Sequence, residues 1–155
     1  MVGSYRMMKV STKSTYAIRA LVDLARSSQE HPERLASIAD RQNIPLPFLE
    51  QIFSKLKNAG LVLAVHGPQG GYQLAKKPDD VSLADVVTVL EGPIEPVLCS
   101  QPHNKSENCH QVEGCMSRHV CSELDGAVYQ ILAKNTVGQL LHESERLGKQ
   151  TVKFE

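Results

Sequence analysis

All four cysteines of the chain, together with three of its six histidines, lie between residues 99 and 121. They are Cys99, Cys109, Cys115 and Cys121, with His103, His110 and His119 between them. Cysteine thiolates hold iron-sulfur clusters and zinc, and thiols can also form disulfides that respond to oxidants. Residues 1–10 carry no secretory signal, so we expect a cytoplasmic protein in which clustered cysteines favour metal or redox chemistry over structural disulfides.

The spacing of these cysteines leaves three kinds of site open. Nine residues separate Cys99 from Cys109, five separate Cys109 from Cys115, and no Cys-x-x-Cys pair occurs. A loop could wrap such thiols around an iron-sulfur cluster, whereas structural zinc sites favour closer pairs. A redox-switched disulfide without any metal is the third reading. Cys121 by itself is also consistent with a small buried core residue.

The even balance of charge over the whole chain hides an asymmetry between its halves. Residues 1–77 contain eleven Lys or Arg and five acidic residues, a net charge of +6, whereas residues 78–155 carry −6. A basic segment followed by an acidic one is typical of a module that binds a polyanion such as nucleic acid. We therefore expect the first half to contain the binding surface.

Hydrophobic periodicity predicts three helices and a hairpin in the first half of the chain. The helices are expected at 14–27, 35–42 and 47–59, and the strands at 61–66 and 72–75. Pro45 breaks the chain before the third helix, Pro47 favours its first turn, and Gly60 ends it. This order predicts a mainly α fold in which residues 8–77 form a winged helix-turn-helix DNA-binding domain.

The second half, residues 78–150, is predicted to be helical and to carry the cysteine loop. We expect a polar linker at 76–80 and helices at 82–90, at 122–134 and from about residue 136 onward. Ser82 and Asp85 have the spacing of a capping box at the start of one of these helices. On the last helix, the side chains expected to face inward are Val137, Leu140, Leu141 and Leu147.

The predicted third helix has one apolar and one polar stripe. The apolar stripe consists of Leu49, Ile52, Phe53 and Leu56, and the polar stripe of Glu50, Gln51, Ser54, Lys55 and Asn58. The polar stripe offers both hydrogen-bond donors and acceptors, which the base edges of a DNA major groove require. The pattern predicts that this helix enters the groove.

Three motifs of the chain resemble those of the Rrf2 family of bacterial winged-helix transcriptional regulators. They are Met8–Lys13 followed by Tyr16-Ala17, the run Leu49–Leu56, and Gly67–Tyr72, within a resemblance that covers about residues 8–147. The family includes iron-sulfur regulators, nitric-oxide sensors and repressors of cysteine metabolism. The resemblance implies a homodimer that forms through a long helix, about Met116–Lys134, and binds a pseudo-palindromic operator in double-stranded DNA.

The resemblance also implies which residues contact DNA. The candidates are Lys13, Tyr16, Pro47, Glu50, Gln51, Lys55 and the wing residue His66. The iron-sulfur members usually carry Arg at the position of His66 and Gly at the position of Gln69. Because Arg is the stronger ligand for phosphates and for minor grooves, the operator sequence and the strength of the wing contact stay open.

For the cysteine loop, the resemblance implies a two-iron or four-iron iron-sulfur cluster held by Cys99, Cys109 and Cys115. The fourth ligand stays open among His119, Cys121, His110 and a group from outside the chain. The histidine that iron-sulfur members place three residues after the third cysteine corresponds to Arg118, which cannot bind a metal. The carboxylate that other members supply from the first helix of the partner corresponds to Thr15.

Together these features predict a dimeric DNA-binding transcriptional regulator, expected to be a repressor, whose affinity for DNA depends on an iron-sulfur cluster. One alternative is a metal-free repressor controlled by thiol oxidation or by a protein partner. A small iron-sulfur carrier or redox protein is another, although it gives no reason for the polar third helix. We expect no enzyme, because Gly-x-Ser-x-Gly, Gly-Lys-Ser/Thr and His-Glu-x-x-His motifs do not occur, and no membrane span, because the longest apolar run, 61–65, is too short.

Overall fold

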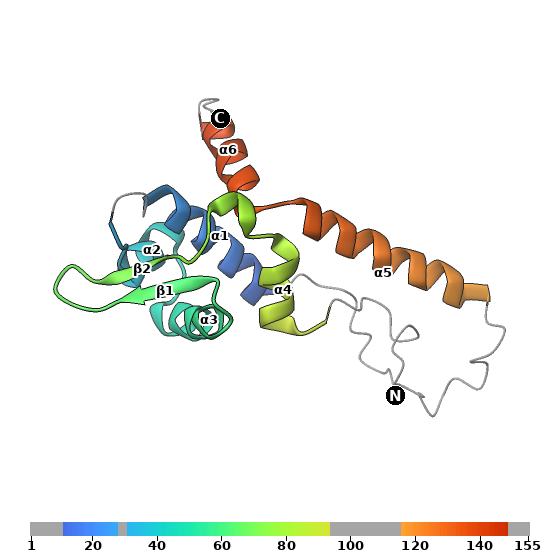
Figure 1. The fold of residues 1–155 in the computed structure, drawn as a ribbon, viewed down its shortest axis with the longest axis horizontal. Helices are drawn as coiled ribbons and strands as arrows, with labels where there is room; N and C mark the ends of the chain where they lie inside the picture. The colour runs from blue at the N-terminus through green and yellow to red at the C-terminus, as the bar shows by residue number, and fades with distance from the viewer. Residues whose placement is uncertain (1–10, 28–30, 94–115, 149–155) are drawn as a thin grey trace.

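The computed structural model describes residues 11–27, 31–93 and 116–148, which form a mainly helical fold with one two-stranded sheet (Figure 1). In chain order the elements are α1 (Thr12–Ser27), α2 (Leu35–Gln42), α3 (Leu46–Asn58), β1 (Val62–Val65), β2 (Gly71–Leu74), the 3-10 helix η1 (Pro78–Asp80), α4 (Leu83–Glu91), α5 (Met116–Lys134) and α6 (Val137–Gly148). Helix, helix, helix and hairpin follow one another as a winged helix-turn-helix requires, so the predicted fold class is confirmed.

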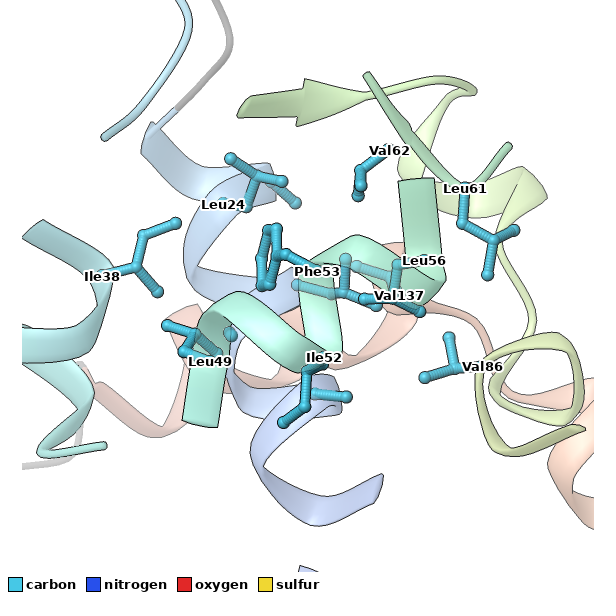
Figure 2. Packing of buried hydrophobic residues seen from close by; sticks show 14 of the residues in the cluster. Leu24, Ile38, Leu49, Ile52, Phe53, Leu56, Leu61, Val62, Val86 and Val137 are labelled. Atoms are coloured by element: carbon cyan, nitrogen blue, oxygen red, sulfur yellow. The ribbon is translucent and has the colours of Figure 1, made fainter. Parts of the chain in front are cut away.

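One apolar core joins α1, α2, α3, the hairpin and α4. Phe53 of α3 lies at its centre, fully buried, and its ring meets that of Tyr72 on β2 at a centroid distance of 5.1 Å. Figure 2 shows how side chains from α1, α2, α3 and the hairpin surround this ring. All members of the predicted apolar stripe of α3 are buried, which confirms the prediction that this face points into the protein.

The turn between α2 and α3 positions the helix that is predicted to enter the groove. The bounds of α2 are those predicted, and the chain leaves it at Asn43, whose φ of 52° lies in the left-handed region. The N–H of Ile44 then donates to the carbonyl of Ala39 over 2.9 Å. α3 begins at Leu46, one residue earlier than expected, because Pro45 occupies the position that precedes its first turn.

The hairpin is tied to the segment that precedes α2. β1 and β2 are antiparallel, with Val62 opposite Leu74 and Val65 opposite Gly71. Beyond β2, the N–H and carbonyl of Tyr72 exchange hydrogen bonds of 2.8 and 2.9 Å with the backbone of Glu33. A Cβ on Gly71 would lie 2.6 Å from the carbonyl carbon of Glu33, so this close approach requires glycine.

Backbone hydrogen bonds also join the C-terminal helices to the start of α4. Leu83 donates to the carbonyl of Asn135, and Val137 donates to that of Val81, each over 2.9 Å. The hydroxyl of Ser82 accepts from the N–H of Asp85, which confirms the predicted cap of α4. These bonds fix the joint between α5 and α6, so that α6 packs against α1 while α5 extends away from the other helices (Figure 1).

Three predictions for the second half require correction. The segment 76–80 is not only a polar linker, because Pro78–Asp80 forms a turn of 3-10 helix. α5 begins at Met116 rather than at residue 122. Leu147, predicted to face inward, is 55% exposed, because α6 reaches past α1 at its C-terminal end while Val137 and Leu141 are buried. Within the described ranges, no helix combines the length and the hydropathy that a bilayer crossing requires.

Candidate nucleic-acid interface

The polar face of α3 is fully available to a ligand. The exposed residues include all five members of the predicted polar stripe and Pro47: Pro47, Glu50, Gln51, Ser54, Lys55 and Asn58. The apolar stripe anchors this helix to the core, so the polar side chains are held on a rigid support. Donors and acceptors on one exposed helix face can read base edges in a major groove, while the lysine can contact a phosphate.

Two candidate residues on α1 approach the same region from the side. The ring of Tyr16 meets that of Phe48, in the first turn of α3, edge to face at a centroid distance of 5.9 Å. The guanidinium of Arg19 lies 5.7 Å from the centre of the Tyr16 ring. Lys13, one turn earlier, donates from Nζ to the carbonyl of Leu90 over 3.4 Å. The structure therefore brings Tyr16 next to α3, whereas Lys13 lies at the end of α4.

Glu91, the last residue of α4, is a residue near this surface that sequence reasoning missed. Its carboxylate Oε1 accepts hydrogen bonds from the hydroxyls of Ser11 and of Ser14, the latter over 2.8 Å. Burial alone would raise the pKa of this carboxyl. Hydrogen bonds from the two hydroxyls, together with the positive charges of Lys13 and Lys55, hold the pKa below its ordinary value of 4.5. No local sequence pattern signals this contact, because the partners are far apart in the chain.

The wing places His66 at the tip of the hairpin, where its side chain is exposed. The turn is closed by a hydrogen bond of 2.9 Å from the N–H of Gly70 to the carbonyl of Gly67, whose φ is 118°. A Cβ on Gly70 would lie 2.9 Å from that same carbonyl oxygen. Glycines at these two positions therefore allow a tight turn that keeps His66 at the end of the wing.

The predicted metal ligands are not brought together by the part of the chain that the structure describes. Cys99, Cys109, Cys115 and His110 lie outside the described residues, as does the side chain of Cys121. His119 is exposed on α5, where its Nε2 lies 3.5 Å from Oε1 of Glu123. Among the described side chains, no group of three Cys, His, Asp or Glu residues could hold a metal ion. The ligand set therefore stays a prediction.

The chain is similar in sequence to known regulators over most of its length. Residues 10–143 match the model of the Rrf2 family, described as iron-dependent transcriptional regulators. The HTH-type transcriptional regulator IscR of Aliivibrio salmonicida is 37% identical over 138 residues, which cover 89% of this chain and 80% of that protein. IscR of Vibrio cholerae is 34% identical over 140 residues, covering 90% and 79% of the two proteins.

Solved structures agree with this similarity. CymR, the global cysteine regulator of B. subtilis, superimposes with a TM-score of 0.76 at 35% identity, covering 88% of this chain and 98% of CymR. IscR of T. potens superimposes with a TM-score of 0.74 at 34% identity, covering 90% of each chain. The similarity therefore extends beyond the winged module into the C-terminal helices.

Proposed function

The chain belongs to the Rrf2 family of transcriptional regulators, and from this premise we propose that it binds operator DNA as a homodimer whose affinity is set by an iron-sulfur cluster. The observation that carries the proposal is the exposed polar face of α3 beside an exposed wing. In the proposed complex, α3 lies in the major groove and Gln51 and Glu50 face base edges. Lys55 contacts a backbone phosphate, and the wing reaches the adjacent minor groove.

The exposed apolar side chains of α5 support the proposed homodimer. Leu124 is 52% exposed and Ile131 is 62% exposed, and Val120 and Tyr129 are also exposed. Four large apolar side chains on one helix are more than a water-facing helix needs, so a second copy of the chain is the partner that we assign to them. Two copies related by a two-fold axis would present two α3 helices to two half-sites of one operator.

The donor set of the cysteine segment fits an iron-sulfur cluster better than zinc. Cys99, Cys109 and Cys115 offer three thiolates, and His119 or Cys121 is the fourth donor within the chain. Zinc sites favour closer cysteine pairs than this segment contains. When bound, an iron-sulfur cluster would supply a constraint on residues 99–121 that responds to iron supply and to oxidants.

Glu91 offers the physical link between the cysteine segment and the DNA-binding surface. It ends α4, and the chain continues from there into the residues that carry the first three cysteines. Its hydrogen bonds to Ser11 and Ser14 tie this end of α4 to the first turn of α1, which carries Lys13. A change in the segment that moves the end of α4 would therefore move Lys13, and two such arrangements would differ in affinity for DNA.

A metal-free repressor is the second candidate function, and the structural similarity to CymR favours it. The superposition on that cysteine regulator covers 98% of its chain. In this alternative the thiols respond to oxidants or the protein binds a partner. Anaerobic purification followed by absorption spectroscopy and by quantification of iron and sulfide decides between the two. A colourless protein without iron supports the alternative.

DNA binding is tested by a pair of lysine substitutions on one helix. Lys55→Ala removes a proposed phosphate contact, whereas Lys57→Ala removes an equally exposed charge from a position outside the polar stripe of α3. On a duplex selected by the wild-type protein from a random library, we expect Lys55→Ala to weaken binding about tenfold and Lys57→Ala to weaken it less than twofold. Equal losses would contradict the proposed orientation of α3.

Control by the cluster is tested on the same duplex with the same protein in two states. Affinity is measured for anaerobically purified protein and for protein from which iron has been removed by a chelator. Equal affinity in the two states would contradict control by the cluster without affecting the proposal that the protein binds DNA.

A further inference from the structure

The wing of this protein carries no residue of fixed charge. Residues 61–75 contain no Lys, Arg, Asp or Glu, and His66 is the only histidine among them. Histidine is charged only part of the time near neutral pH. A surface that approaches the phosphates of DNA gains much of its affinity from fixed positive charges. The wing therefore either binds without one or receives a positive charge from another part of the chain.

Arg34 brings such a charge to the wing from the segment before α2. It occupies the position that caps α2, with an extended backbone, and its Nη2 donates to the carbonyl of Pro68 over 3.1 Å. Pro68 lies in the turn between Gly67 and Gly70, at the tip of the hairpin. The neighbouring residue Glu33 is held against β2 by two backbone hydrogen bonds, so the base of the Arg34 side chain has a defined position.

The charge of Arg34 is not neutralised within the described part of the chain. Arg34 is exposed, and among the described residues its guanidinium forms no ion pair with a carboxylate. The nearby carboxylate of Glu33 is already engaged, because Oε1 accepts from the backbone N–H of Arg34 and Oε2 lies 3.5 Å from Nη2 of Arg41. A guanidinium has five N–H donors, and the bond to Pro68 uses only one of them.

We propose that Arg34 supplies the positive charge of the wing and contacts the phosphate backbone of DNA beside it. This inference rests on the proposed function, since it assigns a further contact to the same DNA-binding surface. One N–H of the guanidinium holds the turn at Pro68, and the others bind a phosphate oxygen. The arrangement places a permanent charge next to His66 without placing it in the hairpin, and a planar guanidinium suits a phosphate better than an ammonium does.

The proposal differs from a purely structural role in one measurable quantity. If Arg34 only fixed the wing turn, its removal would weaken binding without changing how many counterions are released from the DNA. A lost phosphate contact instead lowers the slope of log K against log salt concentration by about 0.9. The salt dependence of binding therefore separates the two roles.

The experiment compares Arg34→Ala, Arg34→Lys and Arg146→Ala in the full chain, on a duplex selected by the wild-type protein. Arg146 is an exposed arginine on α6, far along the chain from the wing, and serves as the matched control. We expect Arg34→Ala to weaken binding about five- to tenfold at 0.15 M salt and to lower the salt slope by about 0.9. Arg34→Lys should restore most of the slope, because it keeps the charge, and Arg146→Ala should match wild type.

Two results would overturn the inference while leaving the proposed function intact. One is an unchanged affinity of Arg34→Ala, and the other is a weaker affinity with the wild-type salt slope. Unfolding in urea shows whether each variant is folded, and Arg34→Lys keeps the test decisive if Arg34→Ala is not. Failure of the wild-type protein to bind any selected duplex would instead refute the proposed function itself, and the inference with it.

Discussion

The buried carboxylate of Asp23 offers the sharpest test of how the helix-turn-helix is held together. It lies on α1, and its side chain is 5% exposed. Nε of Arg41 approaches both carboxylate oxygens, at 3.2 and 3.1 Å, and Nε2 of Gln42 donates to Oδ2 over 3.0 Å. Gln42 is the last residue of α2, so this network ties α1 to the point where the chain turns toward α3.

The expected loss of stability in Asp23→Ala follows from these contacts. The hydrogen bond to the Gln42 amide contributes about 1 kcal/mol. The interaction with Arg41 contributes about 1 kcal/mol rather than the larger value of a buried pair, because the arginine side chain is 44% exposed and is screened by water. Alanine favours a helix over aspartate by about 0.5 kcal/mol, which reduces the net loss to about 1.5 kcal/mol.

Asp40→Ala is the matched control, because Asp40 is an exposed aspartate within the neighbouring helix α2. The same gain in helix propensity applies to it, so we expect it to be equally stable or slightly more stable than wild type. Urea unfolding of both variants at one fixed protein concentration measures the difference, which should be about 2 kcal/mol. A loss in Asp23→Ala that is no larger than that in Asp40→Ala would refute the role assigned to the network.

Three further predictions concern the wing, the end of α4 and α5. Gly71→Ala should destabilise the protein by about 2 kcal/mol in urea unfolding, because the added Cβ displaces the backbone of Glu33 and its two hydrogen bonds to β2; wild-type stability would contradict this close approach. Glu91→Gln should lower the free energy of unfolding above pH 4.5 and converge with wild type at lower pH, because a lowered carboxyl pKa stabilises the folded state only while the group is ionised; an equal difference at pH 3 and pH 7 would show that the charge is irrelevant. Leu124→Glu combined with Ile131→Glu should weaken the proposed dimer by about 100-fold in sedimentation measurements, because each change buries a charge, and an unchanged dimer would place the interface elsewhere.

The features that could be predicted from the sequence are those that depend on neighbouring residues. The bounds of α2 and the cap that Ser82 provides for α4 are as predicted. So is the division of α3 into a buried and an exposed stripe, because burial of one helix face leaves a 3.6-residue period in the sequence. The order of three helices and a glycine-rich hairpin likewise made the winged fold predictable.

The features that escaped prediction join residues that are far apart in the chain. Ser11 and Glu91 are 80 positions apart, and Arg34 and Pro68 are 34 positions apart. Neither contact leaves a periodic pattern, and each pairs common surface residue types. Leu147 was placed wrongly for a related reason, since periodicity shows that a helix has an apolar side but not where its packing partner ends.

The sequence by itself determined which helices form, which faces they bury and which donor types the cysteine segment offers, because these properties depend on residue type and short-range spacing. Only the tertiary structure decided that Tyr16 lies against the start of α3, that Glu91 holds the first turn of α1, and that Arg34 reaches the wing. These contacts follow from the angles and distances at which helices pack. Such angles result from the sum of many weak apolar contacts across the core, and no short motif encodes that sum.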